Sequence, residues 1–195
     1  MKDIVILLGV PGSGKGTQAQ NLINKFGYCH ISTGNLLREL EKKQHLTELE
    51  KAELEKMHNG MLVSDEFIYT LVFDAILACV NQKGKVILDG AIRTLEQAKR
   101  YHDFFVTNNI VEHISAVELH IPDTVIEERL RIRIESGEGR DDDKDPEAIK
   151  HRILLQGNTA LAPIVDFYKQ KGLLQSVDGT QSIGSVFTLL CDAIR

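Results

Sequence analysis

Residues 4–8 and the glycine-rich segment after them constrain the fold more than any other part of the sequence. Residues 4–8 read IVILL, and residues 9–17 read GVPGSGKGT. An uninterrupted aliphatic run of this length indicates a strand that is buried on both faces, as in a parallel sheet. Apolar residues with helical spacing follow the loop and end at Gly27. The order strand, glycine loop and helix predicts the start of an α/β domain.

The glycine-rich segment has the composition of a loop that surrounds a phosphate group. Gly9, Gly14 and Lys15 occur at the spacing of the phosphate-loop pattern. Glycines leave backbone N–H groups accessible to an anion, and the following helix adds the partial positive charge of its N-terminus. The strict pattern has Ser or Thr directly after the lysine, whereas here Gly16 precedes Thr17. The segment predicts nucleotide binding, and the alternative is a chance glycine-rich turn.

The rest of the chain alternates between short apolar runs and helical patterns. This alternation predicts βαβ units, and therefore a parallel sheet with helices on both faces. The expected strands are residues 4–8, 28–31, 86–88, 114–121 and 173–177. The expected helices between and after them are residues 65–80, 95–107, 122–134, 146–155, 163–171 and 182–194.

Two stretches interrupt the alternation. The length of 195 residues predicts one domain. Residues 33–61 are highly charged, contain no strand pattern and favour two or three small helices. Residues 136–145 are rich in Gly and Asp and poor in apolar residues. We expect both stretches to be insertions over the mouth of the sheet.

Composition and charge exclude several classes of protein. The chain is 43% apolar and 26% charged, which excludes a disordered chain. Its net charge of −5 argues against nucleic acid as a partner. The apolar run at residues 4–8 is far shorter than the roughly 20 residues that a membrane span needs. Cys29, Cys79 and Cys191 are isolated and odd in number, without zinc spacing or a disulfide framework, and predict a reducing, cytoplasmic compartment.

Four further motifs give the chain a resemblance to the short-lid adenylate kinases over almost its whole length. They are HISTGNLLR at 30–38, GMLV at 60–63, LDGAIRTLEQA at 88–98 and GRDDD at 139–143. The resemblance implies a P-loop NTPase-type domain over residues 1–195 with a five-stranded parallel sheet, a helical monophosphate-binding insertion at 32–63 and a short lid at 134–145. It also implies a monomeric nucleoside monophosphate kinase that uses Mg²⁺ and transfers a phosphoryl group reversibly, ATP + AMP = 2 ADP, without a covalent intermediate.

The arginines fit the needs of this reaction. Phosphoryl transfer between two nucleotides requires cations that approach the phosphates from several directions, and arginine suits bidentate contacts. Arg129 and Arg133 are four residues apart and share a helix face, whereas Arg131 points elsewhere. The resemblance places Arg129 on the ATP base and Arg133 near its phosphates. The alternative is a solvated, charged helix.

The resemblance implies a role for residues in each part of the site. The residues implied to bind ATP are Gly12, Ser13, Gly14, Lys15, Gly16, Thr17 and Arg129. Those implied to bind AMP are Thr33, Gly34, Arg38, Leu62, Val63, Gly90, Arg93 and Gln97. The catalytic cations are Lys15, Arg93, Arg133, Arg140 and Arg152. Asp89, at the end of an apolar strand, and Thr17 are implied to hold Mg²⁺ mainly through water, and the alternative for Asp89 is a helix cap.

Three residues favour AMP as the acceptor. The resemblance places Thr33, Thr94 and Gln97 where kinases acting on UMP or CMP usually carry other residues. A glutamine can offer one donor and one acceptor to the N6/N1 edge of adenine. The alternatives are helix caps for the two threonines and a solvated helix position for Gln97. A kinase of the same fold with UMP, CMP or another acceptor is therefore the alternative function.

The sequence departs from the family pattern at several positions. Ala91 and Ile92 replace Phe-Pro, which predicts that Arg93 is less firmly aimed and leaves a catalytically weakened nucleotide sensor as a further alternative. Asn35 replaces Asp and removes a negative charge near the metal, and Ser64 stands where proline is common.

The acidity of the chain is concentrated in the predicted lid. Residues 135–147 contain seven carboxylates and two cations, which together equal the net charge of −5. We expect this segment to keep the lid hydrated and open until nucleotide phosphates draw Arg133 and Arg140 inward. Asp145 is the expected cap of the helix that starts at Pro146. The lid has no cluster of Cys and His, so no structural zinc is expected in it.

Overall fold

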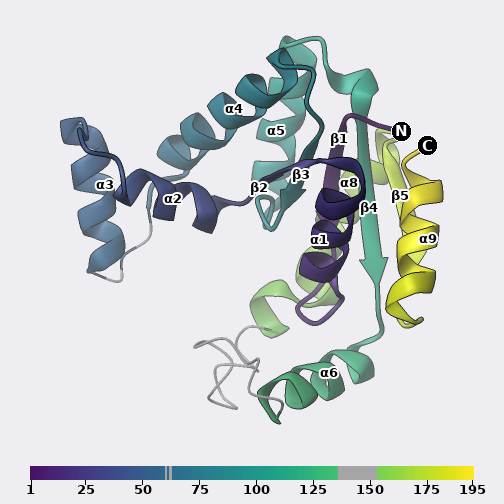
Figure 1. Ribbon diagram of the computed structural model, residues 1–195. Helices are drawn as coiled ribbons and strands as arrows, with labels where there is room; N and C mark the ends of the chain where they lie inside the picture. Colours follow the sequence, from purple (N-terminus) through teal and green to yellow (C-terminus); the bar gives the residue numbers. More distant parts are fainter. Residues whose placement is uncertain (60, 62, 136–152) are drawn as a thin grey trace.

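The computed structural model describes residues 1–59, 61, 63–135 and 153–195. Its sheet has five strands in the order β2-β3-β1-β4-β5, and every pair of neighbours is parallel (Figure 1). The expected parallel α/β architecture is thus confirmed. The strands are β1 (Ile4–Leu8), β2 (Cys29–Ile31), β3 (Val86–Asp89), β4 (Ile114–His120) and β5 (Leu174–Asp178).

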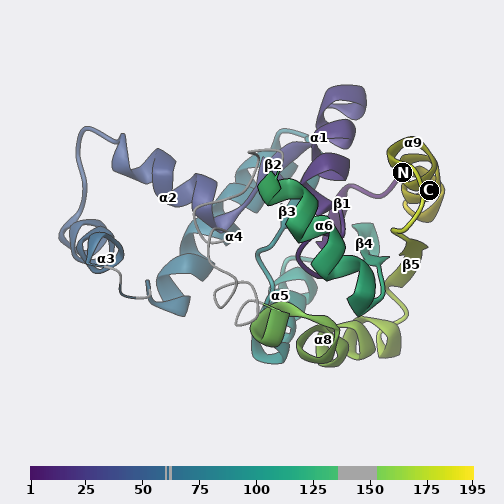
Figure 2. The same ribbon diagram turned by 90° about the horizontal axis from the view of Figure 1, so that it is seen from below.

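Helices cover both faces of the sheet, as Figure 2, seen from below, shows. Between the strands lie α1 (Lys15–Phe26), α2 (Thr33–Glu41), α3 (Glu48–His58), α4 (Asp65–Asn81), α5 (Leu95–Thr107), the 3₁₀ turn η1 (Val111–His113), α6 (Asp123–Glu135) and α8 (Asn158–Gln170). Helix α9 (Ile183–Ala193) follows the last strand. None of the helices in the described ranges is long and apolar enough to cross a bilayer.

The side chains of β1 explain its uninterrupted apolar sequence. All five residues are at most 2% exposed. Ile4 and Ile6 belong to the core cluster formed with α4, α5 and α8, whereas Val5 and Leu7 belong to the cluster formed with α1 and α9. Since successive side chains of a strand point to opposite faces, a strand covered on both sides needs apolar residues at every position.

Helices α2 and α3 form the insertion, which extends away from the sheet on the left of Figure 1. They lie within residues 33–61, where the sequence favours two or three small helices. Leu37, Leu40, Leu54 and Phe67 form a small separate core between α2, α3 and the start of α4. The insertion therefore packs largely against itself and α4.

A buried carboxylate ties the end of the insertion to α4. The side chain of Glu53 is only 5% exposed and lies 2.8 Å from Lys56 Nζ. Its Oε2 accepts from the Ser64 backbone N–H (3.0 Å), and its Oε1 accepts from the Ser64 hydroxyl (3.0 Å). These hydrogen bonds to the ionised form lower the pKa of Glu53 below its ordinary value. A proline at position 64 would lack the backbone donor, so serine at this departure from the family pattern supplies a bond that the family's common residue cannot.

Helix α8 starts earlier than the sequence predicts. It begins at Asn158 and contains Pro163, whereas the expected helix begins at Pro163. Proline disfavours a helix interior because it lacks a backbone donor. Leu161 and Tyr168, seven residues apart, are both buried on the same helix face. Packing of this face outweighs the loss of one hydrogen bond.

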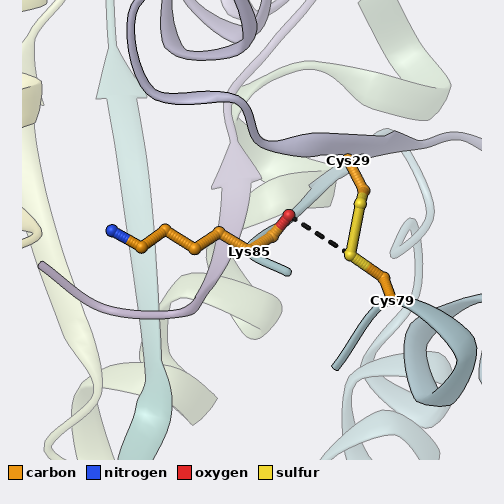
Figure 3. The surroundings of a disulfide bond; sticks show 3 residues. All are labelled: Cys29, Cys79 and Lys85. Carbon is orange, nitrogen blue, oxygen red and sulfur yellow. Dashed lines mark hydrogen bonds between the residues drawn. A yellow bond between two sulfur atoms is a disulfide. The ribbon is translucent and has the colours of Figure 1, made fainter. Parts of the chain in front are cut away.

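A disulfide bond corrects the expectation that all three cysteines are isolated. Cys29 of β2 is bonded to Cys79, in the last turn of α4, with a Cα–Cα distance of 6.8 Å (Figure 3). The Cys79 sulfur also lies 3.5 Å from the carbonyl oxygen of Lys85, whose carbonyl accepts the Cys29 N–H (2.6 Å). The two cysteines are 50 residues apart in sequence, so their spacing carries no sign of the pairing, which depends on the packing of α4 against the edge strand. Cys191 is a free thiol.

Loss of the disulfide is expected to destabilise the protein. Cys79→Ser, or reduction by a thiol, should lower the free energy of unfolding by about 2–4 kcal/mol, because the cross-link restricts the unfolded chain. Urea denaturation followed by circular dichroism, with and without the reductant, measures this change. Cys191→Ser is the matched control and should keep the wild-type sensitivity to the reductant. Equal midpoints for the oxidised and reduced wild type would contradict the prediction.

The Glu53 contacts predict a pH dependence of stability. Because the folded-state pKa lies below the ordinary value of 4.5, the ionised carboxylate stabilises the folded state above that pH, and this contribution disappears as the pH falls through the lowered pKa. Glu53→Gln should therefore reduce stability at pH 7 and reduce the loss of stability on acidification. Urea titrations between pH 7 and pH 3 test this, with Glu55→Gln, an exposed carboxylate of the same helix, as the control. Parallel pH profiles for Glu53→Gln and the wild type would refute it.

Candidate active site

A cleft of about 810 Å³ opens at the carboxyl ends of β1 and β3. The chain leaves β1 toward β2 and leaves β3 toward β4, on the opposite side of β1, so the connections diverge where these two strands end. Such a divergence leaves a crevice in which open α/β sheets bind ligands. The expected site residues that line the cleft are Gly12, Ser13, Gly14, Lys15, Gly16, Thr17, Thr33, Gly34, Arg38, Asp89, Gly90, Arg93, Arg129 and Arg133.

The loop between β1 and α1 has the backbone conformation that its glycines permit. Gly12 has φ +80° and Gly14 has φ +95°, values that other residues rarely adopt. A Cβ atom on Gly9 would lie 2.6 Å from the Ser13 hydroxyl oxygen. Lys15 Nζ donates to the carbonyls of Gly9 (2.6 Å) and Val10 (3.0 Å), and Lys15 lines the cleft. The loop thus places the N-terminus of α1 and the Lys15 ammonium group at the same cleft.

Helix α6 packs beside the phosphate loop and adds guanidinium groups to the cleft. Arg129 Nη1 donates to the carbonyl of Gly12 (3.2 Å), and its Nη2 donates to the carbonyl of Gly179 (2.8 Å). Two carbonyls from distant parts of the chain therefore fix the plane of this guanidinium. Arg133 lines the cleft, whereas the Arg131 side chain is 71% exposed and lies 3.9 Å from Glu135. This is the arrangement that four-residue helical spacing predicts.

A chain of polar contacts runs from α2 to the end of β3. Arg38 Nη2 donates to Asn35 Oδ1, and Asn35 Nδ2 lies 3.5 Å from His30 Nδ1. His30 Nε2 lies 3.6 Å from Asp89 Oδ2. Sequence reasoning gave His30 no role in the site, although it is the first residue of the HISTGNLLR motif and lies near the end of the predicted strand 28–31. That position is the available signal, because strand ends on this side of the sheet face the cleft.

The turn between β3 and α5 holds Arg93 through two hydrogen bonds, although Ala91 and Ile92 replace the Phe-Pro of the family pattern. The Arg93 backbone N–H donates to Gln97 Oε1 (2.7 Å), and Arg93 Nε donates to the Gly90 carbonyl (3.1 Å). Ala91 and Ile92 are each 6% exposed and pack in the core. The two hydrogen bonds and this burial hold the turn in the absence of proline, and the weaker aim of Arg93 at a phosphate stays a prediction.

Several expected residues lie outside the lining of the cleft. Gln97 is half-buried and adjoins the cleft through Arg93, and Thr94 caps α5 by accepting from the Gln97 backbone N–H (3.1 Å). Ser32 rather than Thr33 caps α2, accepting from the Asn35 backbone N–H. Val63 packs against the core of the insertion.

Some expectations concern positions outside the described residues. They are the roles of Leu62, Arg140 and Arg152, residues 136–145 of the lid expected at 134–145 with its acidity and its expected lack of zinc, and the start of the helix at 146–155.

The chemistry of the cleft suits a hard divalent cation. Asp89 and Thr17 both line it and offer a carboxylate and a hydroxyl oxygen, the ligand type that Mg²⁺ prefers. Within the described ranges, no three His, Cys, Asp or Glu side chains gather as a metal site. Two oxygen-bearing side chains beside a phosphate loop fit an ion that keeps several waters and binds substrate phosphates.

Comparisons with known proteins identify relatives of the chain. The Adenylate kinase family model matches residues 7–173. The chain is 37% identical to an adenylate kinase of Porphyromonas gingivalis over 182 residues, which covers 93% of this chain and 90% of that protein. It is 34% identical to one of Phocaeicola vulgatus over 192 residues, covering 98% and 97% respectively. Identity to one of Enterococcus faecalis is 35% over 213 residues, covering 94% and 95%.

The two sides of α6 predict different effects on nucleotide binding. Arg133→Gln should weaken binding of a nucleoside triphosphate by about tenfold or more, because a charged donor in the cleft is lost. Arg131→Gln removes the same charge from the same helix but should leave affinity unchanged. Isothermal titration calorimetry of both variants tests this. Equal losses would mean that α6 acts through its overall charge rather than through the cleft.

Proposed function

This chain belongs to the adenylate kinase family, and from that membership we propose that its cleft catalyses reversible phosphoryl transfer, ATP + AMP = 2 ADP. The observation that carries the proposal is the convergence of cations from separate elements on one cleft. Lys15 comes from the phosphate loop, Arg38 from α2, Arg93 from the β3–α5 turn, and Arg129 and Arg133 from α6. Transfer between the triphosphate of ATP and the phosphate of AMP brings several negative groups together and needs cations from several directions.

The cleft divides into a donor side and an acceptor side in this proposal. The phosphate loop, Arg129 and Arg133 hold ATP, with the Arg129 guanidinium presented flat to the base by its two carbonyl partners. Arg38 and Arg93 hold the AMP phosphate, while Thr33 and Gln97 face its base. Family resemblance adds Leu62 and Val63 to the acceptor side, and Arg140 and Arg152 to the transferring phosphates.

The reaction requires positioning more than covalent chemistry. An oxygen of the AMP phosphate attacks the γ-phosphorus of ATP, the bond from that phosphorus to the bridging oxygen breaks, and ADP leaves with that oxygen. Lys15 exchanges its bonds to the Gly9 and Val10 carbonyls for bonds to phosphate oxygens. Arg93 and Arg133 stabilise the charge on the transferring group. Closure of the insertion and lid over the cleft would exclude water, which otherwise accepts the phosphoryl group.

We propose Mg²⁺ as the divalent ion of this reaction, held by Asp89 and Thr17 mainly through water. Bound there, it would neutralise charge on the ATP phosphates. Support comes from the position of both oxygens in the cleft beside the phosphate loop.

The proposal also describes a cytoplasmic monomer that binds small nucleotides and neither nucleic acid nor membranes. The net charge of −5 supports the exclusion of nucleic acid. The Cys29–Cys79 disulfide counts against the cytoplasmic part of the proposal, because disulfides are rare in a reducing compartment.

A coupled assay of ADP formation tests the activity. The purified chain with ATP, AMP and Mg²⁺ should form ADP, whereas ATP alone should give little. Arg93→Ala should lower kcat/KM for AMP by about 10- to 100-fold, because it removes charged hydrogen bonds to the acceptor phosphate. Lys99→Ala is the matched control, since Lys99 lies on the neighbouring helix and pairs with Glu96 (2.8 Å).

The same assay with UMP or CMP in place of AMP decides between AMP and the alternative acceptors. Faster turnover with UMP or CMP than with AMP would replace the proposed acceptor. Binding of ATP and AMP without turnover would overturn the enzymatic proposal.

A further inference from the structure

The side-chain amide of Gln97 is held by a donor on one side and an acceptor on the other. Its Oε1 accepts from the Arg93 backbone N–H (2.7 Å), and its Nε2 donates to Asp65 Oδ1 (3.2 Å). Asp65 is the first residue of α4 and lies 32 positions before Gln97 in the sequence. The contact therefore joins the end of the insertion to the first turn of α5.

These two partners allow only one orientation of the amide. A backbone N–H can only donate, and an ionised carboxylate can only accept. A reversed amide would place its NH₂ group against the Arg93 N–H and its oxygen against the Asp65 carboxylate, and both hydrogen bonds would be lost. Each amide atom still has bonding capacity, since Nε2 carries a second hydrogen and Oε1 a second lone pair. A donor and an acceptor thus remain, in a fixed order.

We propose that Asp65 is a positioning residue that locks the Gln97 amide in this order and thereby makes the acceptor site select AMP over GMP. The inference rests on the proposed function, because it concerns the acceptor of that reaction. Adenine presents an amino donor at N6 beside a ring acceptor at N1, whereas guanine presents a carbonyl acceptor at O6 beside a ring donor at N1. The same edge therefore carries the opposite order of groups in the two purines.

A locked amide can match only one of these orders. With Nε2 and Oε1 fixed, adenine pairs with both atoms, whereas guanine in the same pose brings acceptor against acceptor and donor against donor. Polar groups left unpaired in a binding site cost far more than a missing contact, which makes such a site selective. An amide free to turn would meet either purine equally well. Selectivity thus depends on the two partners that oppose rotation, the Arg93 N–H and the Asp65 carboxylate.

Glu66, the carboxylate next to Asp65, allows the contact with Gln97 to be tested separately from the effect of a negative charge at the start of α4. Asp65 and Glu66 both lie in the first turn of α4, where a negative charge favours the helix. Glu66 points instead toward Arg100, with its Oε2 3.6 Å from Arg100 Nη2. Glu66→Gln therefore loses the same charge in the same turn without touching Gln97.

The test compares kcat/KM for AMP and for GMP in the wild type, Asp65→Asn and Glu66→Gln. The asparagine amide can offer either a donor or an acceptor, so only the Arg93 N–H still opposes a reversed Gln97 amide, and the reversed order costs one hydrogen bond instead of two. The AMP-to-GMP ratio of kcat/KM should fall at least tenfold in Asp65→Asn, while KM for ATP and the melting temperature match those of Glu66→Gln. In a Gln97→Ala background, Asp65→Asn should have no further effect on the ratio.

The outcomes distinguish this inference from the proposed function. A wild type that forms no ADP from ATP and AMP overturns the function itself. An active wild type whose AMP-to-GMP ratio changes no more in Asp65→Asn than in Glu66→Gln overturns the role of Asp65, as does an equal fall of the ratio in the Gln97→Ala background. Asp65→Ala, assayed beside Asp65→Asn, removes the acceptor without adding an amide and should lower the same ratio, so that poor folding of one variant leaves the other to decide.

Discussion

Every strand of the sheet pairs with β1 directly or through one neighbour, and all five β1 side chains are buried. Because β1 cannot shift without exposing apolar surface on both faces, the point where it ends is fixed relative to both helical layers. The phosphate loop begins at that point. Lys15, Arg129 and Arg133 come from helices that pack on the same sheet, so their positions relative to the loop depend on the burial of this strand, whereas Arg38 comes from the insertion, which packs on α4.

The charged groups of the cleft are held by the protein's own backbone. Carbonyls of Gly12 and Gly179 fix Arg129, the Gly90 carbonyl fixes Arg93, and the loop carbonyls hold Lys15. Such contacts restrict side chains that otherwise lose much rotamer freedom when they bind a phosphate. Part of the ordering cost is therefore met before nucleotide arrives, which favours electrostatic stabilisation of a reacting phosphoryl group.

Local patterns predict the parts of this protein that depend on local physics. The phosphate loop and the two insertion helices follow from residue spacing, because their conformations depend on nearby residues. The Cys29–Cys79 pair and the early start of α8 were missed, since both depend on packing between segments far apart in sequence. The locked amide of Gln97 was invisible for the same reason, because its partner Asp65 comes from another helix. The roles of the site residues stay predictions until the variants are measured.

The disulfide has a consequence for the connectivity of the acceptor side. The bond between Cys29 and Cys79 closes a covalent ring that contains α2, α3 and nearly all of α4. Cleavage of the backbone at one place in this ring, such as the segment between α2 and α3, leaves both pieces joined through sulfur. The oxidised protein would then remain a single molecule after the cut, and only reduction would separate the fragment that carries the phosphate loop from the one that carries Arg93.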